Sequence, residues 1–104
     1  MKELELLQDA VSEKEILELL QDLIRIPSHC DTPGREREIA LYMHEFLLRQ
    51  GIHTELMPVL DERPNVIATL RGSGGGKRLI LNGHIDTIRP YRMEAPYDPV
   101  IREG

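Results

Sequence analysis

The stretch LILNGHIDT at residues 79–87 decides the fold predicted for this chain. Its first three residues are apolar, too few for a helix, and an Asn-Gly turn signal follows them, so a short buried strand is predicted. His84 and Asp86 come just past this strand, where open α/β sheets usually keep their chemistry. Because side chains alternate along an extended segment, these two should point the same way while Ile85 points back toward apolar packing.

An imidazole and a carboxylate on one face can serve a metal site. Neutral imidazole is a common zinc ligand, and a carboxylate beside it can orient the ring, raise its basicity or take part in proton transfer. Zinc needs three or four ligands, however, and a single His-x-Asp pair more often forms a solvated turn or a hydrogen bond. The residues alone therefore leave both interpretations of His84 and Asp86 open.

The composition indicates one folded domain at most. The chain has 104 residues, of which 40% are hydrophobic and 30% charged, which is typical of a folded protein with a modest core. The net charge of -5, with both signs mixed along the chain, argues against nucleic acid or an anionic membrane as a partner. The chain has no apolar run of roughly 20 residues and no signal-peptide pattern, so a cytoplasmic location is predicted.

Cys30 is the one cysteine, which excludes an internal disulfide and a Cys-rich zinc module. Its place beside His29 allows a thiol nucleophile assisted by His29 or His84, and the simpler alternative is an ordinary loop cysteine. The glycine-rich segment at residues 71–77 invites comparison with a phosphate-binding loop. A phosphate-binding loop has four residues between its first glycine and its Gly-Lys pair and a Ser or Thr after the lysine. Here three residues separate them and Arg78 follows the lysine, so a flexible connection between strands is predicted instead.

Two helices precede the predicted strands. Ser12 and Glu15 form a capping-box pattern, so a helix should begin there, after a weaker helical signal, and end near Arg25 or Ile26. A second helix is predicted from Pro33, with Gly51 as its left-handed C-terminal residue. Strands are predicted at residues 52–59, 65–70 and 79–81, with a polar turn at 61–64 and a loop over 88–104.

Four short motifs, spread over nearly the whole chain, carry a resemblance to a known family. They are LIRIPS at 23–28, GRERE at 34–38, RPNVIA at 63–68 and LNGHIDT at 81–87. The chain resembles the N-terminal part of the dinuclear-zinc hydrolases that include acetylornithine deacetylase, succinyl-diaminopimelate desuccinylase, aminoacylase and the carboxypeptidase G type.

The resemblance implies an incomplete α/β fold. Residues 1–104 would form the N-terminal portion of a three-layer catalytic, metal-binding domain, with two or three helices and then three strands of a mixed sheet. The predicted sheet has no helix after its last strand to cover it, which also indicates the beginning of a larger domain. The rest of the catalytic domain and any dimerisation domain would be absent.

The resemblance also implies a site and a reaction. His84 would ligate one of two Zn²⁺ ions, with Co²⁺ as another possible metal, and Asp86 would be a catalytic residue beside it. A metal-held water, activated by a glutamate, would attack the amide carbonyl of an N-acyl amino acid or short peptide. The glutamate and the remaining ligands would lie farther along, so this chain alone is expected to be inactive. Because the fragment would leave apolar sheet surface open, it is also expected to self-associate. The alternative is a non-catalytic binding or structural module completed by another chain.

Overall fold

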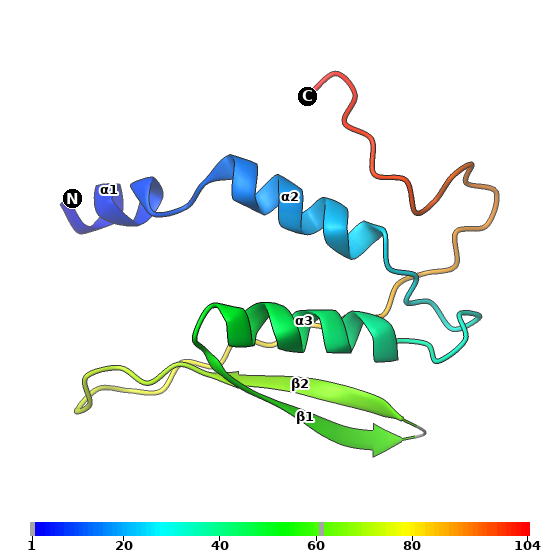
Figure 1. Ribbon diagram of the computed structural model, residues 1–104. Coiled ribbons are helices and arrows are strands. Elements are labelled where there is room, and N and C mark those ends of the chain that lie inside the picture. The colour runs from blue at the N-terminus through cyan, green and yellow to red at the C-terminus, as the bar shows by residue number, and fades with distance from the viewer. Residues whose placement is uncertain (1, 61) are drawn as a thin grey trace. The chain divides into compact units, whose positions relative to one another are not determined.

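The computed structural model describes residues 2–60 and 62–104, which form three helices and two strands (Figure 1). In chain order they are α1 (Lys2–Asp9), α2 (Glu13–Ile24), α3 (Arg37–Arg49), β1 (His53–Leu60) and β2 (Arg63–Thr69). The chain divides into two units, one made of α1, α2 and residues 92–104 and the other of residues 27–91. None of the helices in the described residues has the length and apolarity needed to cross a membrane.

Helix α2 begins where the capping box predicted. Ser12 is its N-cap, and the Ser12 hydroxyl oxygen accepts a hydrogen bond from the Glu15 amide at 3.3 Å. The helix ends at Ile24 with Arg25 as its C-cap, because Pro27 disfavours helical geometry in the residue before it. Both predicted ends are confirmed, and the weaker signal before Ser12 forms the separate helix α1.

The predicted start of the second helix is wrong, whereas its predicted end is confirmed. Helix α3 begins at Arg37 rather than Pro33, because Gly34 and Arg35 have positive φ angles of 76° and 50° that a helix cannot contain. At the other end Gly51 has φ 76°, its amide donates to Leu48 O at 2.9 Å, and the next amide, that of Ile52, reaches the carbonyl of Leu47 at 3.1 Å. These two bonds form a Schellman motif, which satisfies carbonyls at the helix end.

Strands β1 and β2 form an antiparallel hairpin with His53 opposite Thr69. Their positions agree with the first two predicted strands, although β2 begins at Arg63 and so leaves a shorter turn than predicted, in which Asp61 lies outside the described residues. Helix α3 packs on both strands (Figure 1), and its buried side chains, Ile39 and Ala40, are the centre of a small core.

A partly buried ion pair joins α3 to the hairpin. Arg63 donates from Nε and Nη2 to the two carboxylate oxygens of Glu36, at 2.6 Å in each case. Glu36 is the N-cap residue of α3 and is buried, and the hydrogen bonds from Arg63 hold the pKa of its carboxyl below the ordinary 4.5. Bidentate charge-assisted pairs of this kind fix geometry as well as adding stability.

The predicted third strand is wrong. Leu79, Ile80 and Leu81 belong to no strand and are 81%, 78% and 88% exposed. A strand needs a hydrogen-bonded neighbour, and the hairpin pairs only with itself among the described residues. The observed sheet is therefore two-stranded and antiparallel instead of three-stranded and mixed, residues 71–77 do not connect two strands, and the three-layer domain stays a prediction. Residues 88–104 contain no helix or strand, as predicted.

Candidate functional site

The side chains of His84 and Asp86 lie together, as the alternation along an extended segment predicts. His84 Nδ1 is 3.1 Å from Asp86 Oδ1 and 2.9 Å from the Asp86 carbonyl oxygen. The two side chains are 84% and 59% exposed, while Ile85 between them is half-buried. The pair is thus open to a ligand from solvent, although it follows an extended loop and not the strand that was expected.

This contact determines which imidazole nitrogen can bind a metal. With Nδ1 directed at Asp86, Nε2 is the nitrogen that remains for a ligand bond, and a carboxylate on the opposite nitrogen is typical of metal-binding histidines. The donor chemistry therefore fits one metal-ligand position. Among the described residues no group of three or more His, Cys, Asp and Glu side chains could hold a metal ion, so the pair is one part of such a site and not a whole one.

Two segments far apart in the chain meet directly beside the pair. His29 and Thr87 form a parallel β-bridge, and the Thr87 amide donates to Ser28 O at 3.3 Å. The hydroxyls of Ser28 and Thr87 are also 3.3 Å apart, and Ser28 is completely buried. We call residues 28–31 and 87–89 the clasp.

Arg89 closes the other end of the clasp. Its Nε lies 2.8 Å from Asp31 Oδ2 and 3.2 Å from Cys30 Sγ. The hydrogen-bond partner that the structure gives the exposed Cys30 thiol is therefore a guanidinium and not the imidazole that a thiol nucleophile would need as its base. The side chain of His29 accepts a bond from the Asp31 amide at 3.3 Å.

Sequence reasoning missed the clasp. Ser28 and Thr87 enter the sequence analysis only as parts of motifs, because nothing local in either segment indicates a partner 59 positions away. The signal that was present is a small hydroxyl residue next to Pro27 in one motif and at the end of LNGHIDT in the other. Two such motifs in one chain are compatible with a shared site, but they do not predict which residue of one segment lies beside which residue of the other.

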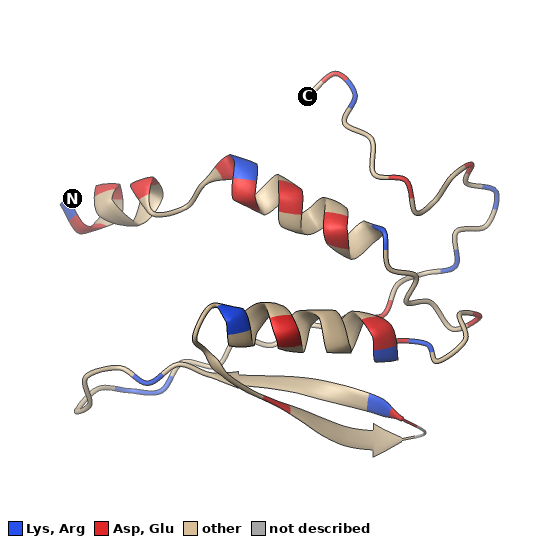
Figure 2. Cartoon of the chain, viewed as in Figure 1, with Lys and Arg blue, Asp and Glu red and all other residues tan. Residues whose placement is uncertain are grey.

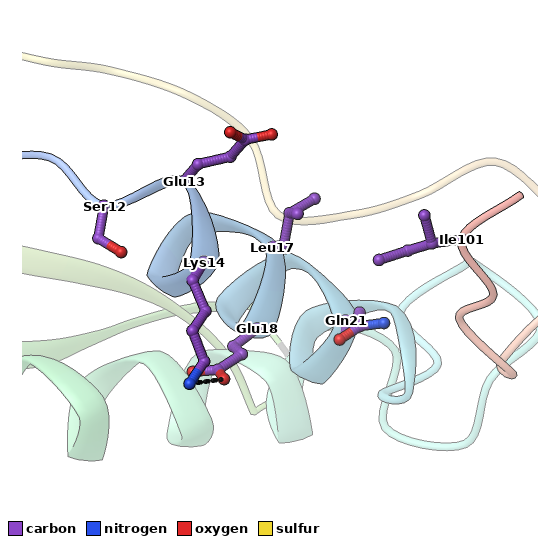
Figure 3. Close-up of a pocket in the computed structure, with 7 residues that line it drawn as sticks. All are labelled: Ser12, Glu13, Lys14, Leu17, Glu18, Gln21 and Ile101. Atoms are coloured by element: carbon purple, nitrogen blue, oxygen red, sulfur yellow. Dashed lines mark ion pairs between the residues drawn. The ribbon is translucent and has the colours of Figure 1, made fainter. Parts of the chain in front are cut away.

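A hollow among the described residues lies elsewhere, in the unit that contains α2. It measures about 590 Å³ and is lined by one face of α2 and by Ile101 (Figure 3). Lys14 and Glu18 form an exposed ion pair there at 3.7 Å, shown dashed in Figure 3, and Glu13 adds a second carboxylate to this wall. It brings together no His or Cys side chain, and the candidate site remains the His84–Asp86 pair.

Comparison with known proteins finds hydrolases. The chain is 27% identical over 99 residues to an N-formyl-4-amino-5-aminomethyl-2-methylpyrimidine deformylase of Halalkalibacterium halodurans, covering 89% of this chain and 23% of the relative. It is 28% identical over 101 residues to a probable carboxypeptidase of Aspergillus clavatus, with 94% and 23% covered. It is also 28% identical over 78 residues to a probable succinyl-diaminopimelate desuccinylase of Staphylococcus epidermidis, with 75% and 18% covered.

The predicted resemblance to this hydrolase family is confirmed. The chain spans less than a quarter of the length of these relatives, so their names describe much longer proteins. No protein-family model and no solved structure matches the chain. What the relatives support is therefore a hydrolase relationship for this chain.

Proposed function

We propose that this chain is the part of a metal-dependent amide hydrolase that supplies His84 as a metal ligand, with Asp86 as the residue that orients it. The substrates would be N-acyl amino acids or short peptides, in a protein of the deacetylase, desuccinylase or carboxypeptidase type. The single observation that carries the proposal is the 3.1 Å contact between His84 Nδ1 and Asp86 Oδ1 on an exposed surface. The hydrolase names of the relatives support the reaction class.

The two residues have separate roles in this proposal. When Nδ1 carries the proton, the carbonyl oxygen of Asp86 at 2.9 Å and its carboxylate at 3.1 Å both accept from it, which fixes the tautomer and leaves the Nε2 lone pair of His84 for a ligand bond. A bound divalent ion would supply a Lewis acid for the amide carbonyl and a water nucleophile at neutral pH.

A cobalt titration tests the ligand role. Co²⁺ added to the chain should bind weakly and change the absorption spectrum, and His84→Ala should remove this change. Asp86→Asn should lower the affinity for Co²⁺ by roughly 10 to 100-fold, the usual effect of losing such a partner. His53→Ala is a matched control, because His53 Nε2 pairs with Glu55 Oε1 at 3.5 Å with the same two-residue spacing on β1. Equal losses in His84→Ala and His53→Ala would contradict the assignment.

The chain by itself should not hydrolyse N-acyl amino acids. One imidazole is a single ligand of the three or four that zinc requires, and the described residues offer no cluster to complete the set. The measurement is release of free amino acid from N-acetylated and N-succinylated substrates with Zn²⁺ or Co²⁺ present. Metal-dependent turnover that disappears in His84→Ala would show that the chain is sufficient for catalysis.

A second candidate function is a non-catalytic module completed by another chain. The observation that favours it is the exposed apolar segment at residues 79–81, whose backbone has no strand partner in the described residues. Such an edge can accept a strand from elsewhere. The cobalt titration separates the candidates, since a purely structural module has no reason to bind the ion through His84.

A further inference from the structure

The clasp reaches the residue that directly follows the His84–Asp86 pair. Both the amide and the hydroxyl of Thr87 are engaged by Ser28, so the backbone leaving Asp86 is fixed in place and direction. We propose that Ser28 and Thr87 are positioning residues, which hold His84 and Asp86 in the orientation that binds a metal ion. This inference rests on the proposed function and adds two residues that touch neither metal nor substrate.

The pair needs such a support because little else restrains it. Its side chains are mostly exposed, so packing does not fix their rotamers. The residues before it, 79–83, join no strand in the described part of the chain, so the restraint comes from the C-terminal side. A ligand set must be held within about 0.5 Å of its working geometry, and exposed loops reach this only through anchored neighbours.

The Ser28–Thr87 contact is specific because Ser28 is completely buried. A buried hydroxyl without a partner loses the hydrogen bonds that it would make to water, so Ser28 favours the arrangement in which the Thr87 hydroxyl is within reach. In the backbone register Thr87 lies opposite His29, so the Ser28 hydroxyl reaches Thr87 diagonally. A one-residue slip would bring Asp86 or Ile88 to the position of Thr87, and neither offers a hydroxyl.

Amide hydrogen exchange measured by NMR on the metal-free chain tests the clasp. Thr87→Val keeps the shape of the side chain and removes the hydroxyl, so exchange at residues 85–88 should become about 2- to 10-fold faster. Thr87→Ser restores a hydroxyl and should return the rates toward wild type. The control is Thr69→Val at the end of β2, which should leave residues 85–88 unchanged.

Cobalt binding tests whether the clasp acts on the pair. Thr87→Val should raise the Co²⁺ dissociation constant by about 2- to 10-fold, and Thr87→Ser should recover most of the loss. A merely structural role would alter the melting temperature without this rescue pattern in the ion titration. The proposal is overturned if Thr87→Val leaves either the exchange rates or the dissociation constant at wild-type values, or if Thr69→Val changes them equally.

Ser28→Ala removes the same hydrogen bond from its other side. Thr87→Val leaves the buried Ser28 hydroxyl unpaired, and if that variant does not fold, Ser28→Ala removes the hydrogen bond without creating an unpaired buried group. Because Thr87 itself is exposed, its hydroxyl can then bind water. The exchange rates are measured without metal, so they report on the clasp independently of metal binding. A wild-type chain that binds no Co²⁺ therefore refutes the proposed function. Unchanged exchange rates in Ser28→Ala refute the role of the clasp.

Discussion

The contacts that give this chain its order are concentrated in a few polar side chains. Glu36 and Arg63 join α3 to the hairpin, while Ser28 and Thr87 join the two halves of the clasp. Each of these contacts links segments separated by many positions and includes a buried partner. Hydrogen bonds to charged groups contribute about 1.5–3 kcal/mol each and neutral ones about 0.5–1.5 kcal/mol, so single substitutions here should be measurable in a chain with so small an apolar core.

Glu36→Gln should destabilise the chain at neutral pH by about 2 kcal/mol, because it removes the charge from a bidentate pair. Arg63 lowers the pKa of Glu36, so the pair contributes its full stability above the ordinary value of 4.5 and loses it as the pH falls through the lower, folded-state pKa. The difference between wild type and Glu36→Gln should therefore shrink from pH 7 to pH 3. Urea denaturation at both pH values measures it.

A matched control for Glu36 is available on the same face. Glu62 pairs with Arg37 at 3.8 Å, but both side chains are more than half exposed. Exposed pairs contribute little, so Glu62→Gln should change the unfolding free energy by less than about 0.5 kcal/mol. If Glu62→Gln costs as much as Glu36→Gln, or if the effect of Glu36→Gln is the same at both pH values, the buried pair does not act as described.

Single elements followed from the sequence where their signals are local. The capping box at Ser12, the glycine at Gly51 and the β-branched run of β2 each act within a few residues, and each element formed near its predicted bounds. The start of α3 did not follow, because the Thr32-Pro33 cap pattern competes with a turn closed by the Arg35 amide on Thr32 O at 2.9 Å. The prediction of a strand at residues 79–81 was wrong, because apolar residues predict burial but do not supply the neighbouring strand that a sheet needs.

The same distinction applies to the site. His84 and Asp86 are two residues apart, so the alternation of an extended chain was enough to predict that they share a face. The clasp depends on a register between segments 59 positions apart, which no single-segment pattern contains. The metal, catalytic and substrate roles of the site came from family resemblance and stay predictions.

Gly51→Ala tests the C-terminal cap of α3. Gly51 has φ 76° with no atom within 4 Å of an added Cβ, so the cost arises from backbone conformation alone and should be about 1–2 kcal/mol. Gly72→Ala is the control, since Gly72 has equally open surroundings without a positive φ and should be neutral or slightly stabilising. Thermal melts of both variants measure the difference. Equal melting temperatures would show that the left-handed cap is not strained by a side chain.

At the scale of the molecule, the net charge is concentrated in the first 24 residues. The first 24 residues contain seven acidic and two basic side chains, which equals the entire net charge of -5. Figure 2 shows these acidic residues, in red, along α1 and α2. The remaining residues are neutral in sum and contain the exposed apolar segment at 79–81. Copies of the chain therefore repel through their acidic helices, whereas residues 79–81 offer an exposed apolar segment for association.

The chain should self-associate through residues 79–81, and more strongly at high salt, because salt screens the repulsion between acidic helices. Ile80→Lys should reduce the association, since it places a charge in an exposed strand-like edge. Leu70→Lys is the control, as Leu70 is equally exposed but lies between Thr69 and Arg71. Sedimentation velocity over a range of concentrations measures the self-association of the chain and of both variants. A monomer at every concentration would contradict the prediction.

The clasp also has a consequence for the order in which the molecule assembles. The helices and the hairpin close over short spans, whereas the clasp must bring together positions 59 apart, at an entropic cost of about 4 kcal/mol before the intervening hairpin shortens the path. Contacts between distant positions form late and open early. We therefore expect the segment that holds His84 and Asp86 to be the last to become ordered during folding and the first to be cut by a protease.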